Sequence, residues 1–197
     1  MVEQKNPKPL RADAERTVQT ILTAAERVLS ASPAATMEQI AEAAGVARTT
    51  VHRRFATREA LVDALSAWAT RQFHDAVVSA PFTAPPLVTL YQATANVLRV
   101  KISWNFAMSR TTPHDPEVAR IHADVLERCD ALFLRARDAG VLRPDVDLLW
   151  VRQVYYALIH EAAQTNSPSD DTDALATLVV DTLLRGAGGP AASLTHR

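Results

Sequence analysis

One short segment concentrates the side chains that bind phosphate. From Arg48 to Arg58 the sequence reads RTTVHRRFATR, which holds four arginines, three threonines, one histidine and no acidic residue. Guanidinium groups neutralise DNA phosphates and release counterions, and hydroxyl groups add hydrogen bonds to the nucleic-acid backbone. The formal net charge of the whole chain is only -1, so this basic character is local. A solvated basic helix face is the alternative interpretation of the same residues.

The other reactive side chains form no pattern for catalysis or metal binding. His114, His122 and His160 lack the helical i,i+4 pairing of metal ligands, so we interpret them as surface or core residues. Cys129 is the only cysteine, which excludes an internal disulfide and favours a small core or boundary residue in a reducing compartment. Nucleophile motifs, phosphate-binding loops and Rossmann glycine patterns are also missing. We therefore expect no enzymatic activity, no cofactor and no metal site.

The elements that must position the basic segment are predicted to be helices. Five glycines in 197 residues are too few for a multi-stranded β-protein, because tight hairpins need residues with positive φ. The eleven prolines leave long proline-free stretches, which predicts helices separated by breaks. The apolar periodicity predicts an all-α fold of about nine helices. Among them are 13–30, 37–44, 47–54, 58–79, 87–110, 117–139, 148–166 and 172–185.

Residues 36–55, TMEQIAEAAGVARTTVHRRF, predict how the basic segment is presented. Thr36 and Gln39 have the spacing of a capping box at the start of a short helix. Gly45 is expected to end that helix in the left-handed conformation, and Ala47 opens the next helix. This arrangement is a helix-turn-helix, whose second helix can enter the major groove of DNA. An ordinary corner between two helices of a bundle is the alternative.

Residues 14–62 resemble the N-terminal DNA-binding domain of TetR-family transcriptional regulators. The resemblance rests on a first helix ending in AAERVLSASP, the Thr36 cap, IAEAAGV, and VHRRFATREAL followed by a long helix. It covers about a quarter of the chain, and the remainder resembles the family only in length and helical layout. The resemblance implies a homodimer that binds an operator and releases it when a small molecule occupies the C-terminal domain.

The resemblance also implies which residues contact DNA. Base-edge contacts are expected at the start of the recognition helix, where an arginine can pair with guanine. His52 occupies a position that is usually tyrosine in the family, and operator affinity is predicted to rise as the pH falls. Ala47 occupies a position that often has a capping hydroxyl. The missing hydroxyl is expected to lower the stability of the recognition helix by about 1 kcal/mol. The expected DNA-binding residues are Thr36, Arg48, Thr49, Thr50, His52, Arg53, Arg54 and Arg58.

The C-terminal part of the chain is expected to bind a ligand and to form a dimer. Its aromatic and amide side chains suit a largely apolar ligand, with ordinary packing as the alternative. The expected ligand-binding residues are Trp68, Tyr91, Trp104, Asn105, Met108, Phe133, Trp150 and Tyr156. The resemblance implies that the last two helices pair with their copies, whereas completion of the monomer core is the alternative. The expected interface residues are Tyr155, Leu158, Ile159, Leu175, Leu178, Val179 and Leu183.

These predictions define a domain plan and a function. The plan is a basic flexible arm at 1–12, a helix-turn-helix domain at 13–60, a ligand-binding and dimerisation domain at 61–190, and a tail at 191–197. The expected function is a cytoplasmic, ligand-responsive transcriptional regulator, most simply a repressor released from a palindromic operator by a small apolar effector. Its partners are double-stranded DNA, the effector and a second copy, without a membrane. A helical ligand-binding or adaptor protein that does not bind an operator is the alternative, and a helical-bundle enzyme is a third, poorly supported one.

Overall fold

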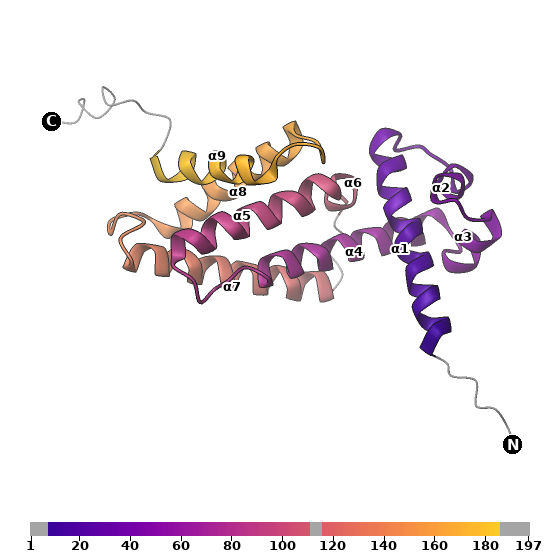
Figure 1. Ribbon diagram of the computed structural model, residues 1–197, viewed down its shortest axis with the longest axis horizontal. Coiled ribbons are helices and arrows are strands. Elements are labelled where there is room, and N and C mark those ends of the chain that lie inside the picture. The colour runs from indigo at the N-terminus through magenta and orange to yellow at the C-terminus, as the bar shows by residue number, and fades with distance from the viewer. Residues whose placement is uncertain (1–7, 111–115, 186–197) are drawn as a thin grey trace, which may run out of the picture. The chain divides into compact units, whose positions relative to one another are not determined.

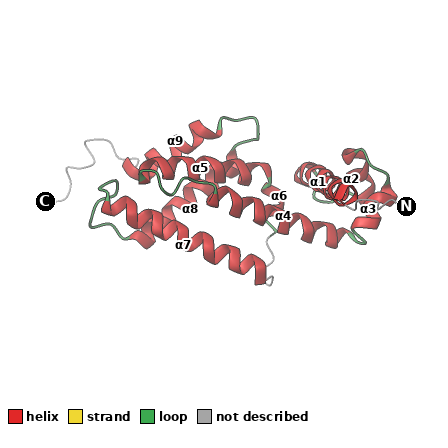
Figure 2. Cartoon of the chain, turned by 60° about the horizontal axis from the view of Figure 1, so that its bottom comes forward, coloured by secondary structure: helices red, strands yellow, loops and turns green. Residues whose placement is uncertain are grey.

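The computed structural model describes residues 8–110 and 116–185, and these residues form nine α-helices and no β-strand (Figures 1 and 2). The all-α prediction is therefore confirmed. The helices are α1 Lys8–Ala31, α2 Met37–Ala44, α3 Arg48–Arg54, α4 Arg58–Val78, α5 Pro86–Ser103, α6 Asn105–Met108, α7 Pro116–Asp138, α8 Leu148–Thr165 and α9 Thr172–Arg185.

Side-chain caps and one glycine define several of these helix ends. Thr57 Oγ1 accepts the backbone N–H of Ala60 at 3.1 Å and caps α4. Asp147 caps α8 by accepting the backbone N–H groups of the second and third helical residues. Gly140 follows α7 with a φ of 73°, a conformation that L-residues rarely adopt. Such local signals explain why the predicted bounds of these helices lie close to those in the structure.

Two predicted elements differ from the structure. α1 begins at Lys8, so residues 8–12 of the expected flexible arm are helical, and residues 1–7 lie outside the described residues. The single helix expected over 87–110 is wrong, because α5 ends at Ser103 and α6 follows it. Trp104 leaves the helical conformation, with φ −125° and ψ 38°. No proline or glycine marks this break in the sequence.

The chain divides into two compact units. Of the described residues, the first contains 8–68 together with 106–110, and the second contains 69–105 together with 116–185. α4 therefore contributes its first half to one unit and its second half to the other. The short segment that begins at Phe106 belongs with the N-terminal helices, although it is remote from them in sequence.

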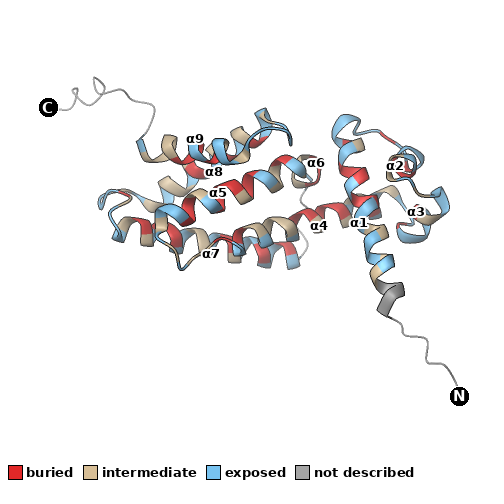
Figure 3. Cartoon of the chain, viewed as in Figure 1, coloured by how far each residue is buried: buried red, intermediate tan, exposed pale blue. Residues whose placement is uncertain are grey.

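Each unit has its own apolar core, visible as the buried positions in Figure 3. Fully buried side chains of the first unit include Ile21, Leu29, Ile40, Leu61 and Leu65. The core of the second unit is drawn mainly from α5, α7, α8 and α9. None of the described helices combines the length and hydropathy needed to cross a lipid bilayer.

Candidate nucleic-acid interface

The turn between α2 and α3 has the geometry predicted for a helix-turn-helix. Thr36 Oγ1 accepts the N–H of Gln39 at 3.3 Å, and the Gln39 side chain accepts the N–H of Thr36 at 2.8 Å. Gly45 has a φ of 65°, and its N–H donates to the last turn of α2. The predicted capping box and glycine C-cap are both confirmed. Together they fix both ends of α2 and therefore the point from which α3 departs.

α3 has one inward position and a broad exposed face. Val51 is fully buried and Phe55, which ends the helix, is 7% exposed. Both side chains anchor α3 to the first unit by apolar packing. The outward positions are Arg48, Thr49, His52, Arg53 and Arg54, with Thr50 half-buried. Ala47 is the N-cap residue of α3 and makes no side-chain hydrogen bond to the first turn of the helix, as the sequence predicted.

An acidic residue that the sequence analysis overlooked holds Arg48. Glu38 lies in the first turn of α2, and its Oε1 is 2.7 Å from Arg48 Nη2. Arg48 Nε also donates to His52 Nε2 at 3.4 Å. The pKa of Glu38 lies below its ordinary value, first because its own backbone N–H donates to it and then because the Thr36 hydroxyl does. Arg48 must exchange these contacts before it can bind a base edge.

Arg58 is part of the scaffold and not a free cation. Its guanidinium donates to the carbonyl oxygen of Ala35 at 3.3 Å and to that of Pro33. These bonds tie the start of α4 to the loop after α1. Arg27 makes a similar bond, donating to the carbonyl oxygen of Ala43 at 3.0 Å. These bonds use Nε and Nη2 of Arg58, and contact of this side chain with the DNA backbone stays a prediction.

The last two residues of α3 remain available. Arg53 and Arg54 are exposed. Across residues 8–110 and 116–185, neither guanidinium has a hydrogen-bond or ion-pair partner. An exposed, unpaired guanidinium is the group that phosphate attracts most strongly, because nothing within the protein competes for it.

The first unit also contains a buried carboxylate. Glu26 of α1 is 5% exposed, and its two oxygens accept the N–H groups of Phe106 at 2.7 Å and Ala107 at 3.0 Å. The Ser30 hydroxyl donates to the same carboxylate at 3.0 Å. Glu26 therefore caps α6. The sequence did contain a signal, since this acidic residue lies four positions after buried Leu22 on the apolar face of α1.

The residues predicted to bind a ligand are divided between the two compact units. Trp68 and Met108 belong to the first compact unit, whereas the other six belong to the second. Phe133 is fully buried and packs edge-on against the Tyr155 ring, with centroids 5.4 Å apart. Trp150 is 63% exposed and lies at the surface of the single chain. The other predicted second-unit positions are half-buried or at the surface: Tyr91, Trp104, Asn105 and Tyr156.

Two of those polar side chains are hydrogen-bonded to neighbouring helices. The Tyr91 hydroxyl donates to Asp181 Oδ1 of α9 at 2.6 Å. Asn105 Oδ1 accepts from the Gln164 amide of α8 at 3.0 Å. Both contacts hold α5 and α6 against the last two helices, so these side chains serve packing in the observed arrangement.

The residues predicted for a dimer interface fall into two groups. Tyr155, Ile159 and Val179 are at most 5% exposed and belong to the core of the single chain. In the single chain these three side chains therefore match the alternative, completion of the monomer core, and their part in an interface stays a prediction. Leu178 of α9 is 63% exposed. The remaining three are partly buried against the core: Leu158, Leu175 and Leu183.

The histidines and the cysteine show no metal geometry. Within the described part of the chain, no three His, Cys, Asp or Glu side chains are grouped to hold a metal ion. His122 and His160 are exposed, and His114 lies outside the described residues. Cys129 is half-buried, and burial raises the pKa of its thiol to about 11.

Comparison with known proteins identifies the family. Residues 21–65 match the family described as bacterial regulatory proteins, tetR family. The chain is 32% identical over 163 residues to the transcriptional repressor LfrR of Mycolicibacterium smegmatis, covering 78% of this chain and 82% of LfrR. It is 29% identical over 189 residues to the regulator NfxB of Pseudomonas aeruginosa, covering 88% of this chain and all of NfxB.

Solved structures agree on the fold. The regulator PfmR from Thermus thermophilus superposes with a TM-score of 0.71 at 18% identity, covering 86% of this chain and 99% of PfmR. LfrR in complex with proflavine superposes with a TM-score of 0.67 at 25% identity, covering 88% of this chain and 98% of LfrR. The relatives are regulators and not enzymes. The chain belongs to the TetR family of transcriptional regulators.

Proposed function

We propose that this protein is a repressor that binds a palindromic operator through α3 and releases it when an effector binds the second unit. The observation that supports this most directly is the exposed face of α3, with two unpaired arginines at its end. Arg53 and Arg54 bind phosphate, while Arg48 and Thr49 lie at the N-terminal end, where base edges are read. His52 adds a further phosphate contact.

A palindrome requires two copies of α3, and the C-terminal helices offer a surface for pairing. Leu149 and Trp150 at the start of α8 are 52% and 63% exposed, and Leu178 of α9 is 63% exposed. Large apolar side chains at such exposure favour burial against a second copy. Two α3 helices in a symmetric dimer would then reach successive major grooves about 34 Å apart.

The repressor and effector parts of the proposal draw on LfrR. That relative is named a repressor, and its structure contains proflavine. α4 runs from the first unit into the second, so a rearrangement of this helix would reach both. An effector can act only by binding two arrangements of the protein with different affinity. Effector binding is expected to favour the arrangement that fits the operator less well.

A gel-shift titration with DNA flanking the gene, at two salt concentrations, tests operator binding. For the wild-type protein, log affinity should fall with log salt by about 0.9 per phosphate neutralised. The double variant Arg53→Ala, Arg54→Ala should reduce the slope of log affinity against log salt by about 2 per copy of the chain. Arg120→Ala, at an exposed position of α7, is the matched control and should leave the slope unchanged.

The alternative, a helical adaptor that does not bind an operator, predicts a different result. The wild-type protein would then show no shift at either salt concentration. An equal shift for the wild-type protein and the double variant would mean that DNA binds somewhere other than α3. Either outcome rejects the proposed interface.

A further inference from the structure

Lysine is rare in this chain, and one lysine is unusually placed. Only Lys5, Lys8 and Lys101 occur among 21 basic residues, so arginine supplies nearly all of the positive charge. Lys101 is in the last turn of α5, within the second unit. It follows Val97 by four residues and Leu98 by three, and those two side chains are 6% and 0% exposed. Lys101 therefore lies next to the buried face of α5, and it is itself half-buried.

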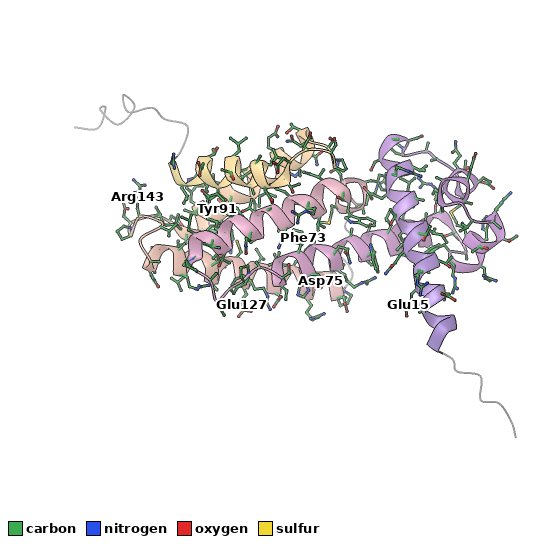
Figure 4. All side chains as sticks on the ribbon, viewed as in Figure 1. Glu15, Phe73, Asp75, Tyr91, Glu127 and Arg143 are labelled. Carbon is green, nitrogen blue, oxygen red and sulfur yellow. The ribbon has the colours of Figure 1, made fainter. Side chains whose placement is uncertain are left out.

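The ammonium group of Lys101 faces an aromatic ring. Nζ is 6.0 Å from the centroid of the Phe73 ring, which belongs to α4. Phe73 packs against the core of the second unit and is labelled between α4 and α5 in Figure 4. A ring face attracts a cation weakly, and much less than a carboxylate does. The ring therefore holds the ammonium without neutralising it.

Lys101 has no acidic partner among the described residues. Asp124 of α7, whose carboxylate faces α4, already contacts two other basic side chains. Asp124 Oδ2 is 3.0 Å from His74 Nε2 and 2.7 Å from Arg128 Nε. Burial lowers the pKa of Lys101 below its ordinary value, and no ion pair opposes that effect. An unpaired cation withdrawn from water is costly unless an anion joins it.

We propose that Lys101 and Phe73 form an anion-binding site in the second unit, which takes a small molecule with an apolar body and a carboxylate head. The carboxylate pairs with the Lys101 ammonium, and the apolar body contacts Phe73 and the neighbouring core. This inference names the chemical class of the effector and so rests on the proposed function. The proposed site would repel proflavine, the planar acridine cation present in the LfrR structure.

Matched probes test the charge preference directly. Acridine-9-carboxylate and proflavine share the acridine ring system but carry opposite charge, and decanoate and decanol share a chain. Binding is measured by thermal shift and by fluorescence titration on the full chain without DNA. The wild-type protein should bind at least one of the two carboxylates, and more tightly than its matched partner. Lys101→Met should weaken that binding about ten- to hundredfold, and Lys101→Arg should retain most of it.

Two controls separate a ligand site from a structural role. Arg99→Met removes an exposed cation from the same helix and should leave probe binding unchanged. A lysine in the last turn of a helix also stabilises the helix dipole. If that were its only role, Lys101→Met would lower the melting temperature without changing probe affinity. That result, or failure of both carboxylates to bind, overturns the proposal.

A second readout follows the Lys101 side chain of the wild-type protein directly. Reductive methylation with ¹³C labels three lysines, and the Lys101 signal is the one that Lys101→Arg removes. The bound carboxylate should shift this signal and raise its midpoint of titration, whereas a neutral or cationic probe should not. An unshifted signal in the presence of a bound carboxylate overturns the proposal. A failed gel shift with an intact Lys101 response would instead reject only the operator function.

Discussion

Replacing Glu26 should destabilise the first unit more than any other single acidic substitution on α1. In Glu26→Ala the N–H groups of Phe106 and Ala107 lose their acceptors, which lie 2.7 and 3.0 Å away. A buried polar group without a partner costs about 1–3 kcal/mol, so two such groups cost about 2–6 kcal/mol. Water entering the space and relief of the buried charge offset part of this. We expect the free energy of unfolding to fall by about 3 kcal/mol.

The assay is urea denaturation followed by circular dichroism and tryptophan fluorescence. Glu26→Gln keeps one acceptor oxygen and should lose about 1–2 kcal/mol. Glu15→Ala is the matched control, because Glu15 is exposed on the same helix (Figure 4). It should change stability by less than about 0.5 kcal/mol. Equal losses for Glu26→Ala and Glu15→Ala would refute the capping role.

The same side chain predicts a pH dependence. Burial raises the pKa of Glu26 above its ordinary value, although the N–H groups of Phe106 and Ala107 and the Ser30 hydroxyl act in the opposite direction. The folded chain therefore holds this proton at a higher pH than the unfolded chain does. Its contribution to stability is fully present below the ordinary pKa and is lost as the pH rises through the folded value. Glu26→Gln should remove this slope, and a slope that persists would assign it to another group.

The remaining predictions concern the recognition helix. Glu38→Gln releases Arg48 and removes a negative charge near DNA, so operator affinity should rise up to about fivefold in a gel shift; weaker binding would show that the pair positions Arg48. Gly45→Ala should lower the free energy of unfolding by about 1 kcal/mol, because its φ is 65° while nothing lies within 4 Å of an added Cβ. Unchanged thermal stability of that variant would contradict the strain argument.

Local sequence signals were sufficient for most helices and for the turn before α3. Thr36, Gln39 and Gly45 act within a few residues of one another, so their pattern is readable from the sequence. The break between α5 and α6 is different, because it has no proline or glycine. Its capping group is Glu26, which is 80 residues away along the chain. Only the folded structure brings these groups together.

The surface residues were harder to predict for the same reason. A list of basic residues on α3 and α4 does not show which cations are already paired. Arg58 donates to carbonyl groups of residues that precede it by more than 20 positions. Arg48 forms an ion pair with Glu38 of the neighbouring helix. Similarly, Tyr155 and Ile159 read as surplus apolar residues, yet they complete the core of the second unit.

The charged groups of the first unit therefore have two separate tasks. Glu26, Arg27 and Arg58 are bonded to backbone groups and keep the helices in register. The two arginines keep their charge, because carbonyl groups do not neutralise it, but part of their donor set is used within the chain. Among the described residues Arg53 and Arg54 are free, and Arg48 becomes available only by leaving Glu38. Of the four arginines between Arg48 and Arg58, only Arg53 and Arg54 make no contact within the described residues. The salt dependence of operator binding should therefore depend most on these two side chains, because cations that displace counterions set it.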